Sequence, residues 1–127
     1  MGQYHKIVNL DKKQYLHPHR FDDGLKLMEF GQSGSGTLLG LTILLSCSNG
    51  RGGGDFRGDS DLVGTWAGDR IAIIGDYGEA GDLPAEFDAE HLYSACDDGG
   101  EYEDISDAVV GALKEAGEWL RGEESRF

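Results

Sequence analysis

The chain has 127 residues, a formal net charge of −13, 39% hydrophobic residues and two cysteines. That length and hydrophobic fraction predict one globular domain with a buried core, and they exclude a disordered chain. The negative charge argues against direct binding of nucleic acid or anionic membranes, and it favours a basic protein surface as the partner.

The charge is unevenly distributed along the chain. Residues 1–58 carry five acids and seven bases, whereas residues 59–127 carry nineteen acids and four bases. Halophilic adaptation would acidify the whole surface, so the asymmetry favours a local acidic surface instead. The alternative is that the acidity serves solubility alone.

The sequence contains no membrane-spanning segment, no disulfide framework and no local cysteine metal motif. No apolar stretch approaches the roughly 20 residues that span a bilayer, and the first residues lack the apolar segment of a signal peptide. We therefore expect a cytoplasmic protein. Cys47 and Cys96 are too few for a disulfide framework and too far apart for a local metal site, so both are expected to line the core, with no cofactor. The sequence does not define the oligomeric state.

The first thirty residues predict a β-hairpin followed by an ambiguous segment. Residues 4–10 alternate as a strand does, and a polar turn leads to a second strand at 14–17, which Pro18 ends. Residues 25–30 fit either a third strand or a short helix capped by Asp23. We favour the strand.

The middle of the chain predicts a helix, a long loop and a central strand. A glycine-rich loop at 31–36 precedes an apolar run, which predicts a buried helix over about residues 36–48. Residues 49–61 carry five glycines and predict a loop. Residues 71–74 are apolar at every position, which is typical of a strand covered on both faces, so we predict a central strand near 70–76.

The last part of the chain is acidic and ends in a helix. Acidic loops at 78–90 and 97–103 flank a short strand or turn at 91–96. An apolar stripe at helical spacing predicts a second helix over residues 104–121, with Asp104 as its N-cap. Together the elements predict a single α+β domain with a small mixed or antiparallel sheet and two helices.

The sharpest local pattern is GQSGSGT at residues 31–37. It matches the phosphate-binding loop G-x-x-x-x-G-K-[ST] except that the lysine is missing. The candidate anion-binding residues are Ser33, Gly34, Ser35, Gly36 and Thr37. The lysine supplies the charge that meets the β- and γ-phosphates, so we favour a loop that merely joins two elements, with nucleotide binding as the alternative.

Four other residues are candidates for catalysis. His17 and His19 project to one side of an extended segment, as metal ligands can, and Arg70 stands next to Asp69 among many carboxylates. A structural role is the favoured interpretation for all four. Imidazoles often bond turn backbone, and an isolated arginine usually pairs with carboxylates.

The favoured function is a binding module that docks a basic, nucleic-acid-binding type of partner by electrostatic mimicry, as immunity and anti-defence inhibitors do. Its candidate contacts are carboxylates of the two acidic loops: Asp82, Glu86, Asp88, Glu90, Asp97, Asp98, Glu101 and Glu103. The alternative is a small enzyme or anion-binding domain that uses residues 31–37, residues 17–20 and Arg70.

In combination, the segments MGQYHKIVNLDKK, HPHRF, RGGGD and WAGDRIAIIGDY resemble a family of small intracellular proteins scattered through bacteria, mobile elements and some fungi. The resemblance extends over nearly the whole chain. It implies one intact domain and an accessory role in conflict or regulation. The family has no assigned activity, so the resemblance implies no catalytic residue.

Overall fold

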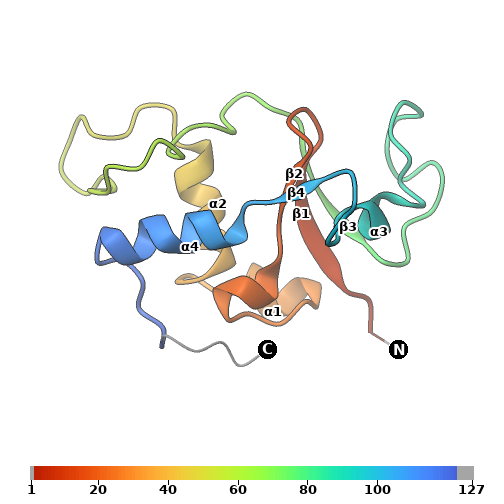
Figure 1. Ribbon diagram of the computed structural model, residues 1–127, viewed down its shortest axis with the longest axis horizontal. Coiled ribbons are helices and arrows are strands. Elements are labelled where there is room, and N and C mark those ends of the chain that lie inside the picture. The colour runs from red at the N-terminus through yellow and green to blue at the C-terminus, as the bar shows by residue number, and fades with distance from the viewer. Residues whose placement is uncertain (1, 123–127) are drawn as a thin grey trace.

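The structure is a computed structural model, and it describes residues 2–122. Strands β1 (His5–Asn9), β2 (Gln14–Leu16), β3 (Ile71–Gly75) and β4 (Glu103–Asp104) form one sheet in the order β3-β1-β2-β4 (Figure 1). β1 pairs antiparallel with β2 and β3, and β2 pairs parallel with β4. The mixed sheet confirms the predicted α+β class.

Helices cover both faces of this sheet. Helices α1, α2 and α4 lie on one side and α3 lies on the other (Figure 1). In the described residues no helix is long and apolar enough to cross a membrane. The helical elements are η1 (Pro18–Phe21), α1 (Leu27–Gly31), α2 (Thr37–Leu45), α3 (Leu92–Ala95) and α4 (Ser106–Glu115).

The predicted hairpin is confirmed, and a buried asparagine shapes its turn. The side-chain oxygen of Asn9 accepts the backbone N–H groups of Asp11 at 3.0 Å and Lys12 at 2.8 Å. Such a bond imitates a backbone turn and satisfies two amides that lie outside the ladder. Lys13 then takes a φ of 55°, and β2 ends before Pro18, which has no N–H to donate to a ladder.

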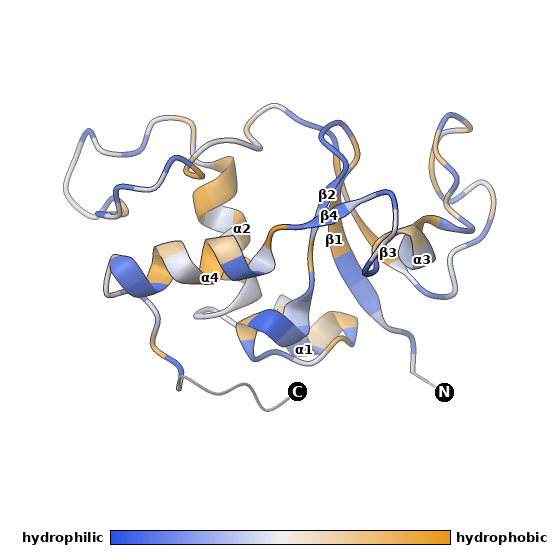
Figure 2. Ribbon diagram, viewed as in Figure 1, coloured by the Kyte–Doolittle hydropathy of each residue, from blue (hydrophilic) through white to orange (hydrophobic). Residues whose placement is uncertain are grey.

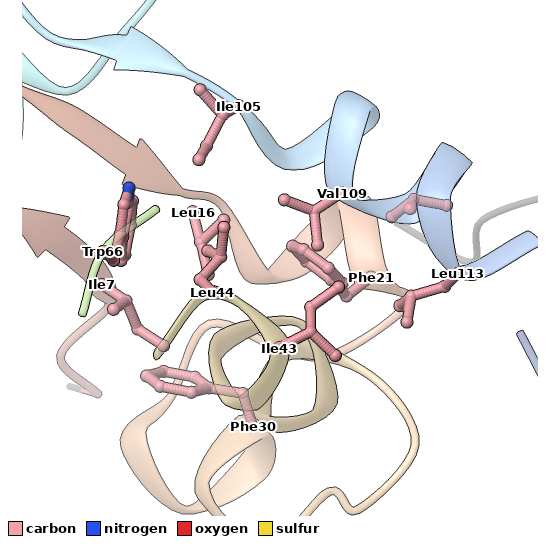
Figure 3. Close-up of a cluster of buried hydrophobic side chains, with 11 residues drawn as sticks. Ile7, Leu16, Phe21, Phe30, Ile43, Leu44, Trp66, Ile105, Val109 and Leu113 are labelled. Atoms are coloured by element: carbon pink, nitrogen blue, oxygen red, sulfur yellow. The ribbon is translucent and has the colours of Figure 1, made fainter. Parts of the chain in front are cut away.

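Alternate residues of β1 point into two separate hydrophobic cores. Ile7, paired with Leu16, faces the helical side (Figure 3), whereas Val8, paired with Tyr15, faces α3. The first core consists of Ile7, Leu16, Phe21, Phe30, Ile43, Leu44, Trp66, Ile105, Val109, Val110 and Leu113. The second consists of Val8, Leu10, Tyr15, Ile74, Ala89, Leu92 and Cys96.

The strand near 70–76 exists, but its predicted central position is wrong. β3 lies at the edge of the sheet, and β1 is an inner strand with buried residues on both faces. Ile73 of β3 is 46% exposed, whereas Ile7, which pairs with it across the ladder, is 0% exposed. Both cores draw on β3 through Ile71 and Ile74, which explains why the run is apolar on both faces although one edge is open.

The strand favoured for residues 25–30 is wrong, because the segment forms α1. The Glu29 carboxylate accepts the backbone N–H of Lys26 at 2.9 Å and so satisfies an amide at the start of this helix. Only Phe30 of α1 is buried. The alternating pattern therefore did not reflect two faces of a strand. Asp23, the expected cap of such a helix, caps α2 instead.

Several predicted boundaries change. Within residues 91–96, Leu92–Ala95 forms helix α3 rather than a strand or turn. The last helix is shorter than the predicted 104–121 at both ends. It begins at Ser106 with Ile105 as its N-cap, so the predicted N-cap Asp104 is wrong: Asp104 lies in β4, and its carboxylate accepts the N–H of Ser106 at 2.8 Å.

At the other end of α4, Gly117 takes a φ of 73° and the chain reverses. The N–H of Glu118 donates to the carbonyl of Leu113 at 2.9 Å, and that of Gly117 donates to Lys114 at 3.1 Å. These two bonds form a Schellman motif, which satisfies the last carbonyls of α4.

We expect Ile7→Ala to lower the free energy of unfolding by about 2–5 kcal/mol, because it empties space in a fully packed core. Ile73→Ala removes the same atoms at the paired edge position and should cost about 1 kcal/mol or less. Urea denaturation in dilute solution measures both values. Equal losses would contradict the assignment of β1 as the covered inner strand.

Candidate functional site

The two acidic loops lie side by side around α3 (Figure 1). Loop 78–90 leads into this helix and loop 97–103 leads from it to β4. All eight carboxylates predicted to bind a partner are exposed. The structure therefore collects on one side of the sheet a set of acids that the sequence spreads over more than twenty positions.

A cavity of about 390 Å³ lies where the two loops meet. We call it the α3 groove. Its apolar lining comes from Leu10, Phe87, Leu92, Ala95 and Tyr102. Its polar lining comes from Lys13, Glu86, Asp88, His91 and Glu101. Three of the eight predicted carboxylates thus line one cavity, together with Lys13, His91 and an apolar wall.

The polar side chains of the α3 groove form ion pairs with one another or with close neighbours. Glu86 lies 3.5 Å from Arg70, Asp88 lies 3.0 Å from His91, and Glu101 pairs with Lys13. These partners are exposed, and surface pairs of this kind contribute about 0–1 kcal/mol. The charged side chains of the groove therefore form ion pairs, but these pairs stabilise the fold only weakly.

The negative charge of this side is only partly neutralised. Residues 78–103 contain nine carboxylates and no lysine or arginine. From the rest of the described chain, Lys13 and Arg70 form ion pairs with these residues, and Lys6 donates to one of their carbonyls. Nine acids against three cations leave a clear negative excess around α3.

Lys6 is a feature that the sequence interpretation missed. It is buried under α3, its Nζ donates to the carbonyl of Cys96 at 2.5 Å, and it lies 4.2 Å from the ring centroid of Tyr93. Burial lowers the pKa of Lys6 and raises the pKa of the Cys96 thiol to about 12. The lysine anchors the end of α3, and the thiol is unreactive. Cys47, also predicted to line the core, is exposed instead.

Arg70 and Asp69 connect the β1–β2 turn to the start of β3. The Arg70 guanidinium donates to Asp11 at 2.7 and 3.0 Å, and this bond lowers the pKa of the Asp11 carboxyl. Asp69 accepts from Asn9 at 2.9 Å and from Lys12 at 2.5 Å. This geometry supports the structural interpretation of both residues.

His17 and His19 lie together with their ring centroids 5.1 Å apart. Nδ1 of His17 accepts the backbone N–H of His19 at 3.3 Å, and the backbone N–H of His17 donates to Oγ of Ser106 at 2.7 Å. Burial lowers the pKa of His17 to about 4, so this imidazole is neutral at physiological pH. In the described residues no three histidine, cysteine or carboxylate side chains are placed to hold a metal ion.

Two side chains from other parts of the chain, those of Arg121 and Asp23, bind the segment 31–37 that resembles a phosphate-binding loop. Nη1 of Arg121 donates to the carbonyls of Phe21 and Asp22 at 2.7 and 2.8 Å and to Oδ1 of Asp23 at 2.6 Å. The same guanidinium bonds the hydroxyls of Ser33 and Ser35.

The start of α2 is equally occupied. Oδ2 of Asp23 accepts the backbone N–H of Thr37 at 2.8 Å and its hydroxyl at 2.6 Å. A carboxylate already sits where a bound anion would sit, next to Gly36, whose Cβ position would meet Asp23 and Arg121. The arrangement therefore does not support anion binding at residues 33–37.

The glycine-rich loop 49–61 encloses a cavity of about 660 Å³. One oxygen of Asp55 accepts the backbone N–H groups of Gly50, Arg51 and Gly52 at 2.9–3.0 Å, and these bonds lower the pKa of its carboxyl. Asn49 and the backbone of Phe56 bond each other in both directions. The polar side chains that close this loop are thus used by its own backbone.

These observations define a small α+β domain with its acidic surface gathered around α3. Comparison of the chain with protein-family models, with curated proteins and with solved structures finds no match. Only the geometry of the described residues therefore bears on function.

The structure brings together some predicted site residues and separates others. Glu86, Asp88 and Glu101 converge on the α3 groove. Arg70 bonds Asp11, and the side chain of His17 accepts from the backbone of His19. The connection between the histidines and residues 33–37 is a structural one: the N–H of Asp22 donates to the His19 carbonyl, and Arg121 bonds both the Asp22 carbonyl and the Ser33 hydroxyl. Phe87 was not predicted to belong to the site, although its position between Glu86 and Asp88 in an acidic loop could have indicated it.

We expect Arg121→Gln to destabilise the fold by about 3–5 kcal/mol, because it leaves the buried charge of Asp23 without its cation. The Asp23 side chain is 4% exposed and that of Arg121 is 17% exposed. Lys13→Gln, which breaks the exposed pair with Glu101, serves as the control and should cost less than about 1 kcal/mol. Similar small losses for both variants, measured by urea denaturation, would show that the Arg121 network is not structural.

His17 should make stability depend on pH. Its pKa is about 4 in the folded chain against 6.5 as the ordinary value, so the unfolded chain binds more protons between these two pH values. Stability is complete above pH 6.5 and falls as the pH is lowered towards 4. We expect His17→Gln to flatten this part of the thermal melting curve against pH, while His91→Gln, at an exposed histidine, keeps it. Identical profiles for wild type and His17→Gln would refute the assignment.

Proposed function

We propose that this protein is a binding module that docks a basic partner protein on the acidic surface around α3. The observation that carries this proposal is the convergence of both acidic loops on one groove with an apolar wall and a carboxylate rim. An acidic surface that serves solubility alone needs no such cavity, because evenly spread charge is sufficient for solubility.

The α3 groove suits a lysine or arginine side chain. The aliphatic stem of such a residue packs on apolar surface while its charged head reaches carboxylates, and here Phe87 and Tyr102 supply the first and Glu86, Asp88 and Glu101 the second. The ring of Phe87 already carries a cation, since Arg70 lies 4.9 Å from its centroid.

The ion pairs inside the groove do not block this role. Lys13 and His91 are exposed, and they can exchange carboxylates with an incoming cation because such pairs contribute little to stability. Asp97, Asp98 and Glu90 extend the negative surface beyond the groove and steer the partner by long-range attraction.

The partner that fits best is a protein whose own basic surface binds nucleic acid. Exposed carboxylates along two adjacent loops present negative charge as a phosphate backbone does, so they compete for the same arginines and lysines. Such an inhibitor acts in the cytoplasm, where its targets are. The alternative of a small enzyme has less support, because the histidines, Arg70 and residues 33–37 do not form one site.

The test uses an immobilised oligolysine peptide and surface plasmon resonance. We expect binding to weaken steeply as KCl is raised, because the attraction is between exposed charges. A groove variant that combines Glu86→Gln, Asp88→Asn and Glu101→Gln should lose about tenfold in affinity, which corresponds to about 1.4 kcal/mol.

The matched control carries the same change in net charge elsewhere on the surface: Asp59→Asn, Glu115→Gln and Glu118→Gln. It should lose less than about threefold, since these residues lie outside the two loops and act only through long-range charge. Equal losses for the two triple variants would mean that only net charge matters. Binding that does not change with KCl would also contradict the proposal.

A further inference from the structure

β3 has the sequence of an inner strand but lies at the edge of the sheet. Its residues Ile-Ala-Ile-Ile-Gly contain no charge and colour as hydrophobic in Figure 2. Exposed edges in proteins usually carry lysine, proline or a bulge, which prevent another strand from pairing. β3 has none of these, and Ile73 in its centre is 46% exposed.

The outer edge of β3 has backbone groups available for pairing. The N–H of Leu10 donates to the backbone carbonyl of Arg70, and the N–H of Asp76 donates to that of Tyr4. Residues 70 and 76 therefore belong to the hydrogen-bonded pairs of the β1–β3 ladder. Hydrogen-bonded pairs occur at every second residue of an antiparallel ladder, so the backbone N–H and C=O groups of residues 72 and 74 also point toward β1. Those of residues 71, 73 and 75 point away from it. Within residues 2–122, the only hydrogen bond to these outward groups is Gly78 N–H to the Gly75 carbonyl.

We propose that two copies of this chain pair through β3, antiparallel and about a two-fold axis at Ile73. Ile73 then lies opposite Ile73 of the second copy, and Ile71 lies opposite Gly75. These are the residues whose backbone groups point outward, so the Ile73 pair exchanges two hydrogen bonds. Each Gly75 N–H donates to an Ile71 carbonyl of the other copy, while the Gly75 carbonyl keeps its bond from Gly78. The pairing makes β3 an inner strand of a sheet that is continuous across both copies, which is the position its sequence predicts.

The charged residues on either side of β3 favour a second copy of the chain as the pairing strand, in the register with Ile73 on the axis. With Ile73 on the axis, Arg70 of one copy lies across from Asp76 of the other, and the symmetry repeats this contact. Asp76 uses Oδ1 to accept the N–H of Tyr4, which leaves its second oxygen for the arginine. Opposite charges across neighbouring strands are stabilising, and like charges are not.

This dimer does not rest on the proposed function, although Arg70 contacts Glu86 and Phe87 of the α3 groove as well as facing Asp76 of the other copy. It uses a strand edge, whereas the partner is proposed to bind the α3 groove. The two respond oppositely to salt, because each copy carries a net charge of −13 and the copies repel one another. Added KCl should therefore strengthen the dimer while it weakens binding to oligolysine.

Sedimentation equilibrium of the full chain over a range of concentrations tests the dimer. We expect a reversible monomer–dimer equilibrium that tightens with KCl. Ile73→Lys should weaken it by about tenfold or more, because two lysines then face each other on the axis. Leu120→Lys, at an exposed apolar residue outside the strand, is the matched control and should leave the equilibrium unchanged.

The register is tested by mixing two variants. Arg70→Glu places a glutamate opposite Asp76, and Asp76→Lys places a lysine opposite Arg70, so each variant alone should remain monomeric. Mixed in equal amounts they should form a heterodimer, because every facing pair is then of opposite charge. Native mass spectrometry separates the heterodimer from the two monomers, and thermal melting confirms that both variants fold.

Three results would overturn the inference. The first is a wild-type chain that stays monomeric at every concentration and salt. The second is a dimer that Ile73→Lys leaves intact, since it would use another surface. The third is a monomer whose β3 edge pairs with a basic peptide, seen as protection of the Ile73 amide from hydrogen exchange only when the peptide is present.

Discussion

The structure depends on the burial of β1 on both faces. Ile7 and Val8 are adjacent in sequence, yet each lies fully buried in a different core, so one short strand holds the helical layer and the α3 layer together. The hydrophobic core on each face is small, and a strand that contributes side chains to both cores buries apolar surface on both of its faces. The acidic surface is positioned as a consequence, because α3 is fixed to the second face.

Three lysines of the front half of the chain bond its acidic second half. Lys6 holds the end of α3 from inside, Lys13 bonds the second acidic loop, and Lys12 bonds Asp69 beside β3. The uneven charge of the sequence thus has two structural consequences. A few contacts bind the two halves together, and the remaining carboxylates stay on the surface around the α3 groove, where a cation from another protein can reach them.

Local patterns predicted the elements whose signals are local, and failed where long-range pairing decides. The β1–β2 hairpin, the existence of α2 and α4 and the α+β class follow from periodicity and turn residues. The edge position of β3 does not, because an apolar run records burial of its faces and not the number of neighbouring strands. α1 was missed since six alternating residues fit either period. The role of Arg121 was out of reach, because its partners lie about 86–100 positions away.

The bonds of Arg121 also have a consequence for how the chain reaches its native state. Asp23 and the first turn of α2 are made early in synthesis, but the guanidinium that neutralises this carboxylate is 98 residues further along the chain. Closing so long a loop is slow compared with forming the local hairpin. The helical layer is therefore completed only after residue 121 has been made, whereas the hairpin needs only pairing between residues 7 and 16.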